Sequence, residues 1–326
     1  MDSSKTEIAH EFLQLLRIYK DGRVERLVGT DVVPPSIDPK TGVSSKDITI
    51  INPQLGNISA RLFLPKLTHP NQKIPLLLHF HGSGFCVFSS FNPTSHNYLN
   101  TLVSEANIVA LSVNYRKAPE HPIPAAYDDS WVALQWAVSH CNGGGPEVWL
   151  NDYADFERVF LAGESTGGNI VHNLAMMAGE SGFGPGVRII GAAMVHPYFW
   201  GSDPIGSEAL DPERKASADR LWPFVCPSNP DNDDPRANPV AEGAPSLVGL
   251  GCGRVLVCVA EKDILRDRGL LYYEALGRSG WMGVVKIVDT EGEDHCFHVY
   301  DLESEKAKDL NKRLAAFFNR DMPPLL

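Results

Sequence analysis

The sequence predicts an α/β protein in which a mostly parallel sheet is covered by helices on both faces. Short, continuous apolar segments recur along the chain, helix-compatible stretches separate them, and one apolar segment passes through a glycine-flanked serine directly into a helical stretch. Continuous apolar runs are typical of strands buried on both faces, and their alternation with helices is typical of parallel sheets. With 326 residues, the chain is long enough for one large domain, and we expect residues 1–326 to form it.

The expected elements follow in a regular order after about residue 40. Two segments with alternating apolar and polar residues, 47–51 and 58–64, suit antiparallel strands near an edge of the sheet. The segments predicted to be further strands, mostly buried on both faces, are 75–80, 107–113, 158–162, 187–195, 254–259 and 284–288. The helical stretches between them are about 95–106, 124–140, 168–179, 267–279 and 304–319.

Two regions depart from this alternation. Residues 1 to about 40 do not resemble part of a sheet: apolar residues in 11–19 have helical or mixed spacing, Asp21-Gly22 favours a turn, and the prolines in 32–36 favour an extended arm. This region could be a lid or simply a packed arm. The stretch from about 198 to 250 is rich in Pro, Asp and Asn, and we expect it to be an insertion over the carboxyl ends of the strands, as part of a cap.

The strand-to-helix turn Gly163-Glu-Ser-Thr-Gly167 carries the main chemical signal. Glycines two residues before and after Ser165 prevent collisions with the neighbouring strand and helix. Such a turn exposes the hydroxyl at the top of the sheet, where the amides of the helix N-terminus also point. A plain structural turn could contain the same residues, but a strand before it and a helix after it favour a nucleophile elbow.

A second glycine-containing turn, His81-Gly-Ser-Gly-Phe85, directly follows the apolar segment 75–80. Glycines let the backbone approach a ligand closely and present its amides. Acyl transfer needs such donors for the oxyanion of its tetrahedral intermediate. The backbone amides of Gly82, Ser83 and Thr166 would supply them. An ordinary turn at a strand end is the alternative, and the presence of the elbow favours the oxyanion hole.

A serine nucleophile needs a base, and the base needs a carboxylate to orient it. In proteins with a nucleophile elbow, the carboxylate and then the histidine follow the serine, each in a loop after a later strand. The loop after 254–259 contains Asp263, which we favour as the carboxylate. Glu261 is a lesser candidate, and Asp267 is interpreted as an acid at a helix N-terminus.

The loop after 284–288 contains two histidines. His295 follows Gly292-Glu-Asp and is favoured as the base by the order of the chain. His298 lies among Phe297, Val299 and Tyr300, which is typical of a packing position.

The composition disfavours several classes of partner. The formal net charge of −11 argues against nucleic acid and anionic membranes. No stretch approaches the ~20 apolar residues that cross a bilayer, and the polar N-terminus indicates neither secretion nor organelle import, so we expect a cytosolic protein. The six cysteines are widely spaced, without metal-binding spacing, and are interpreted as reduced thiols. No cofactor or metal is suggested, and the protein would be a monomer or a homodimer.

Taken together, the two glycine turns and three further motifs resemble the plant carboxylesterases, in the hormone-sensitive-lipase-like branch of the α/β-hydrolase superfamily. The further motifs are Tyr115-Arg-Lys-Ala-Pro-Glu-His-Pro-Ile-Pro-Ala-Ala-Tyr-Asp-Asp129, Asp263-Ile-Leu-Arg-Asp267 and Asp294-His-Cys-Phe-His298. Lys20-Asp-Gly-Arg-Val-Glu-Arg26 and Val33-Pro-Pro-Ser36 extend the resemblance over almost the whole chain. The resemblance implies an α/β-hydrolase fold, Ser165 as nucleophile, His295 as base, Asp263 as its orienting carboxylate, and a cap to which the N-terminal arm contributes.

Two positions within the glycine turns depart from the family pattern. Ser83 stands where a third glycine is usual after the histidine, and Thr166 stands where alanine is usual after the nucleophile. The backbone amides survive both changes, whereas the added hydroxyls could alter the shape or polarity of the pocket.

The family includes esterases, 2-hydroxyisoflavanone dehydratases, alkaloid-cyclising enzymes and gibberellin receptors. The presence of His295 argues against a pure receptor. We therefore expect a serine carboxylesterase for small or medium apolar esters, such as plant specialised metabolites. A dehydratase or cyclase on the same scaffold is the alternative, because a Ser/His pair under an oxyanion hole can also stabilise an enolate or remove a proton. A hormone receptor ranks last.

Overall fold

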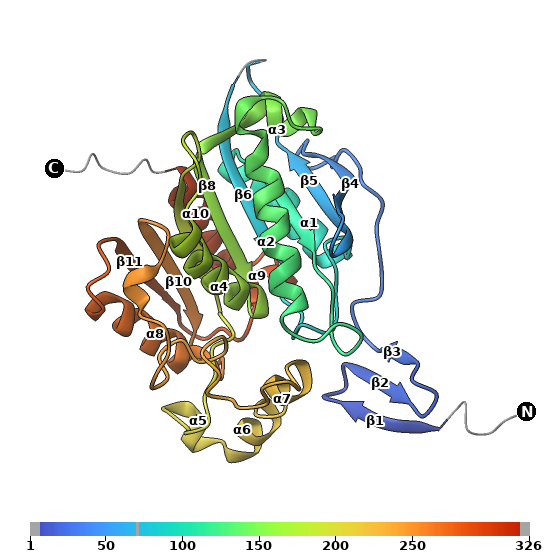
Figure 1. The fold of residues 1–326 in the computed structure, drawn as a ribbon, viewed down its shortest axis with the longest axis vertical. Helices are drawn as coiled ribbons and strands as arrows, with labels where there is room; N and C mark the ends of the chain where they lie inside the picture. Colours follow the sequence, from blue (N-terminus) through green and yellow to red (C-terminus); the bar gives the residue numbers. More distant parts are fainter. Residues whose placement is uncertain (1–6, 70–71, 320–326) are drawn as a thin grey trace, which may run out of the picture.

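The computed structural model describes residues 7–69 and 72–319 and confirms the α/β architecture (Figure 1). Its central sheet has eight strands in the order β11-β10-β9-β8-β6-β7-β5-β4. β5 pairs antiparallel with β4 and β7, and every other pair of neighbours in this sheet is parallel. The strands are β4 (Ser44–Asn52), β5 (Gly56–Leu64), β6 (Ile74–Phe80), β7 (Val109–Asn114), β8 (Ala154–Glu164), β9 (Ile189–Val195), β10 (Arg254–Ala260) and β11 (Val284–Thr290).

Helices cover both faces of the sheet (Figure 1). Leu77 of β6 packs in a cluster with residues of α1 (Pro93–Ala106) and α10 (Glu305–Asn319), whereas its neighbours Leu76 and Leu78 pack in a second cluster. That second cluster includes residues of α2 (Ala125–Val138), α4 (Thr166–Ser181) and α8 (Arg266–Arg278). Successive side chains of a strand point to opposite faces, so a strand between two helical layers carries apolar side chains on both faces. The shorter helical elements of the body are Ser139–Asn142, α3 (Val148–Tyr153), Leu247–Gly249 and α9 (Phe297–Tyr300).

The N-terminal region was predicted not to form part of a sheet, and this prediction is wrong. β1 (Ile8–Phe12), β2 (Leu16–Tyr19) and β3 (Val24–Arg26) form a separate three-stranded antiparallel sheet. Leu13 and Gln14 form the first turn with φ of 47° and 57°, a conformation in which glycine or asparagine is usual, so the residue types do not indicate a hairpin. The second turn, at Asp21-Gly22, is the one that the sequence predicts. Residues 1–6 lie outside the described residues.

The N-terminal sheet is packed against the body and against the 198–250 segment. Phe12 and Leu16 are buried, and the Phe12 ring stacks on Phe224 of α7 (Leu221–Val225) with centroids 3.9 Å apart. Arg26 donates from Nε to the Cys86 carbonyl at 2.7 Å. The 198–250 segment also contains α5 (Ser207–Leu210) and α6 (Pro212–Ala218), and with β1–β3 it lies beyond the carboxyl ends of the strands (Figure 1).

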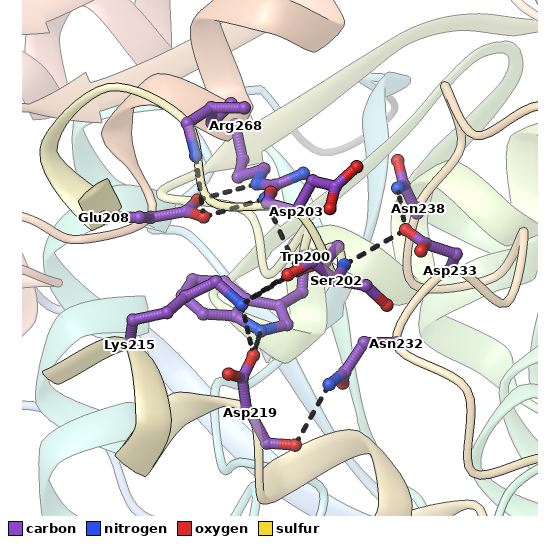
Figure 2. A network of polar contacts seen from close by, with 12 residues as sticks. Trp200, Ser202, Asp203, Glu208, Lys215, Asp219, Asn232, Asp233, Asn238 and Arg268 are labelled. Carbon is purple, nitrogen blue, oxygen red and sulfur yellow. Dashed lines mark hydrogen bonds and ion pairs between the residues drawn. The ribbon is translucent and has the colours of Figure 1, made fainter. Parts of the chain in front are cut away.

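A buried polar network holds α5 and α6 to the body (Figure 2). Arg268 of α8 donates to both carboxylate oxygens of Glu208, at 2.6 and 2.7 Å, and both side chains are almost fully buried. Lys215 donates to the carbonyls of Gly201 and Ser202 and contacts Asp219. Each buried charge therefore has an acceptor or a counter-charge, which such burial requires.

Among residues 7–69 and 72–319, no helix combines the length and apolarity that a membrane span requires.

Candidate active site

The turn at Ser165 has the strained geometry of a nucleophile elbow. Ser165 lies between β8 and α4 with φ 55° and ψ −119°, outside the usual regions for a residue with a side chain. A Cβ on Gly167 would lie 1.8 Å from the Phe80 carbonyl oxygen, and one on Gly163 would lie 2.6 Å from the same atom. Backbone contact therefore requires both glycines, as the sequence predicts.

The second glycine turn lies beside Ser165. A Cβ on Gly82 would come within 3.2 Å of the Ser165 Cβ. Thr166 is the first residue of α4, and first-turn amides lack acceptors within their own helix. The amide of Ser83, however, donates to Thr166 Oγ1 at 3.1 Å. Of the three predicted oxyanion donors, that of Ser83 is thus engaged within the protein.

The structure brings Asp263 and His295 together, although they are 32 residues apart. Oδ2 of Asp263 lies 2.6 Å from Nδ1 of His295, and Oδ1 accepts the Leu265 amide at 3.0 Å. Asp263 is 2% exposed. Burial alone would raise the pKa of Asp263, but the His295 ring and the Leu265 amide hold it below its ordinary value.

The other candidates lie elsewhere. Glu261 accepts the Gly292 amide, and Asp267 lies in the first turn of α8 and accepts the Ser207 amide. His298 is fully buried and packs edge-on against Tyr98, as expected for a packing residue.

His295 lies in an unusual electrostatic environment. Burial alone would lower the pKa of His295, but the Asp263 carboxylate, hydrogen-bonded to Nδ1, holds it above its ordinary value. The next residue, Cys296, has φ 55° and places its amide 2.9 Å from Nδ1 of His196. This nitrogen must accept, so His196 is neutral and holds the backbone beside His295.

The patterns in the sequence did not identify His196 as part of the site. It follows β9, whose neighbour β10 leads to the Asp263 loop. Because the carboxyl ends of adjacent parallel strands lie at one edge of the sheet, the position of His196 in the chain was the available signal.

Ser165 and His295 line one cavity of about 230 Å³. Apolar side chains from distant segments contribute to its wall: Leu15, Val87, Phe88 and Val299. Leu15 comes from the N-terminal sheet region, so this region is packed against the body and also contributes to the cavity wall. The cavity is small for a ligand site, since such sites commonly measure about 300–1,000 Å³.

One part of the cavity wall is polar. Both carboxylate oxygens of Glu164 lie 3.0–3.1 Å from Nε2 of His79, whose Nδ1 lies 3.2 Å from the Ser112 hydroxyl. Glu164 and His79 are buried and line the same cavity as Ser165. Glu164 is thus a buried, hydrogen-bonded residue beside the elbow and not a solvated one.

One group of possible metal ligands occurs in the described part of the chain, formed by His196, His295 and Cys296. One ring nitrogen of each histidine and the Cys296 sulfur lie within 4.8 Å of one another. Nitrogen and sulfur donors suit Zn²⁺. However, Nδ1 of His295 is hydrogen-bonded to Asp263, and Nδ1 of His196 accepts the Cys296 amide.

All six cysteines are free thiols, five of them buried.

Comparison with known proteins agrees with this fold. A family model described as "alpha/beta hydrolase fold" matches residues 77–299. The chain is 49% identical over 320 residues to a protein named "Probable carboxylesterase 2" of Arabidopsis thaliana, covering 98% of this chain and 99% of that protein. It is 48% identical to a "2-hydroxyisoflavanone dehydratase" of Glycyrrhiza echinata, covering 97% of each. Among solved structures, an esterase of Pyrobaculum calidifontis has a TM-score of 0.70 and 28% identity, over 84% of each chain.

Hydrolases that use a nucleophile elbow share a strained serine turn, a mostly parallel sheet and an Asp–His pair at the ends of later strands. This structure has all three features. The chain belongs to the α/β-hydrolase fold family, with plant carboxylesterases and 2-hydroxyisoflavanone dehydratases among its relatives.

Proposed function

We propose that the protein is a serine carboxylesterase that hydrolyses small or medium apolar esters through an acyl-enzyme on Ser165. The observation that carries this proposal is the 2.6 Å contact between Asp263 and His295 beside a cavity that Ser165 also lines. With Nδ1 held by the carboxylate, His295 would present Nε2 to the substrate side, as a general base must.

The reaction would take two steps. His295 accepts the proton of the Ser165 hydroxyl while Oγ attacks the ester carbonyl, and His295 then returns that proton to the departing alcohol. Water releases the acyl group from Ser165 by the same route in reverse. The amides of Gly82 and Thr166 would hold the oxyanion, and that of Ser83 would join them only after leaving Thr166 Oγ1.

The cavity supports this class of substrate. Its volume of about 230 Å³ suits a small group, and the apolar side chains of Leu15, Phe88 and Val299 suit a hydrocarbon rather than a charged one. We propose that β1–β3 and the 198–250 segment together act as the cap, because Leu15 reaches the cavity and Phe12 stacks on Phe224.

The test is intact-mass spectrometry after a fluorophosphonate probe, together with release of nitrophenol from p-nitrophenyl butyrate. We expect one probe adduct, on Ser165, and ester turnover. Ser165→Ala should abolish both, whereas Ser95→Ala, which changes another serine of the same cavity, should keep the adduct. Full ester turnover by Ser165→Ala would refute the proposal.

A dehydratase is the second candidate, and the 48% identity to 2-hydroxyisoflavanone dehydratase favours it. Elimination needs a base and an oxyanion hole but forms no acyl-enzyme. A probe adduct on Ser165 with negligible turnover of p-nitrophenyl esters, combined with water loss from a 2-hydroxyisoflavanone, would support this candidate instead.

A further inference from the structure

The amide of Ser83 and the hydroxyl of Thr166 form a hydrogen bond inside the protein. The amide donates to Thr166 Oγ1 at 3.1 Å. Thr166 is completely buried, and Ser83 is 6% exposed and lines the cavity. An N–H group has a single proton, so this amide cannot point at the same time to a substrate oxygen in the cavity.

The neighbouring hydroxyls set the direction of the remaining protons. The His81 carbonyl can only accept a hydrogen bond, so the Tyr115 hydroxyl, 2.7 Å away, donates to it. Its oxygen lies 2.7 Å from Ser83 Oγ, so Ser83 must donate to it. Ser83 Oγ can then accept the Thr166 proton across 3.4 Å. The Thr166 hydroxyl is thus oriented so that its lone pair faces the Ser83 amide.

We propose that the Thr166 hydroxyl withholds the Ser83 amide from the oxyanion hole, so that the site stabilises the tetrahedral intermediate with the amides of Gly82 and Thr166 alone. This proposal rests on the proposed esterase function. The acceptor in this contact is the Thr166 side chain, since alanine at position 166 would leave the Ser83 amide without it. Thr166 is therefore a residue that attenuates acyl transfer, acting through Ser83.

The consequence is an increase in turnover when the hydroxyl is removed. Loss of one oxyanion donor commonly lowers kcat by about 10²–10³-fold. Because a released amide need not reach ideal geometry, we expect an increase of about tenfold in kcat for p-nitrophenyl butyrate on Thr166→Val. Thr166→Val keeps the branched shape without the hydroxyl, and Thr166→Ser keeps the acceptor and is the matched control.

Two further readouts separate this role from a merely structural one. A trifluoromethyl ketone forms a hemiketal oxyanion on Ser165, and its affinity should rise in Thr166→Val by about the same factor as kcat. The thermal unfolding temperature should fall in the same variant, because the buried Ser83 amide loses its acceptor in the resting protein. A structural residue would lower stability and turnover together.

The outcomes are distinct. The proposal would be overturned if Thr166→Val showed unchanged or lower kcat and ketone affinity while Thr166→Ser resembled wild type. The Thr166 hydroxyl would then have no effect on the oxyanion or would itself donate to it. A measurement independent of turnover uses the ¹⁵N-labelled Ser83 amide resonance during titration with butyrate, whose carboxylate mimics the oxyanion. We expect a shift in Thr166→Val and none in wild type. A shift in wild type would also overturn the proposal, even if the protein proved not to be an esterase.

Discussion

The backbone amide of Cys296 donates to Nδ1 of His196 at 2.9 Å and ties the loop that carries His295 to the end of β9. His196 is 1% exposed, and its burial lowers its pKa well below the ordinary value, so the ring stays neutral and able to accept. The position of the proposed base therefore depends on a histidine that takes no part in the proposed proton transfers.

His196→Phe should loosen this loop. The variant keeps an aromatic ring but leaves the buried Cys296 amide without an acceptor, which costs about 1–3 kcal/mol of unfolding free energy. We expect kcat/KM for p-nitrophenyl butyrate to fall as well. His172→Phe is the control, since His172 is also buried and loses its contact with the Tyr272 hydroxyl. It should lose stability in urea unfolding without a comparable fall in kcat/KM, and equal falls in both variants would contradict the assigned role.

The pH profile of ester hydrolysis should report the raised pKa of His295. Only the neutral ring can act as a base, so kcat/KM should rise with pH through a midpoint above 6.5. The Asp263 carboxylate, 2.6 Å from Nδ1, stabilises the protonated ring and so raises this pKa. Asp263→Asn should therefore move the midpoint to lower pH, although the overall rate falls because the ring loses its orienting acceptor. An unchanged midpoint in the variant would contradict this influence of the carboxylate.

The pair of Asp263 and His295 should also leave a pH signature in stability. The pKa of Asp263 is lowered in the folded state, so its contribution is present above its unfolded pKa and is lost as pH falls through the folded value. The pKa of His295 is raised, so its contribution is present at low pH and is lost as pH rises through its folded value. The difference in unfolding free energy between wild type and Asp263→Asn should be largest between these limits. A difference that does not vary with pH would contradict this linkage.

The elbow should not tolerate a methyl group at Gly167. A Cβ there would lie 1.8 Å from the Phe80 carbonyl oxygen, so β6 or α4 must move. We expect Gly167→Ala to cost more than about 3 kcal/mol or to prevent folding. Gly144 serves as the control, because a Cβ on Gly144 would meet no heavy atom within 4 Å beyond its neighbours in the chain. Gly144→Ala should stay within about 0.5 kcal/mol of wild type in urea unfolding, and similar values for both variants would refute the packing argument.

The network under α5 should be sensitive to the loss of one partner. Glu208→Ala leaves the buried Arg268 guanidinium without its counter-charge and should cost about 3–5 kcal/mol of unfolding free energy. The exposed pair of Arg278 and Glu274 provides the comparison, with side chains 80% and 54% exposed. Glu274→Ala should cost no more than about 0.5 kcal/mol. If urea unfolding gave equal losses, burial of the Glu208 pair would not be the cause.

Much of the fold follows from local patterns in the sequence. The apolar segment 75–80 has no polar alternation because its side chains enter two separate cores, and this predicts a strand between two layers of helices. The N-terminal hairpin was missed because Leu13 and Gln14 adopt positive φ, which their residue types do not indicate. Packing of Phe12 on Phe224 accompanies this turn, and such a contact between distant segments has no local signature.

The sequence by itself determined the elbow and the candidates for its partners, because glycines at fixed distances from Ser165 and loops after later strands are local features of the chain. Only the tertiary structure decided between Asp263 and Glu261, by placing one carboxylate 2.6 Å from His295 and the other on the Gly292 amide. It also decided where the Ser83 amide points. A hydrogen bond depends on distances of a few tenths of an ångström between segments far apart in the chain, and those distances are set by how the strands and helices pack.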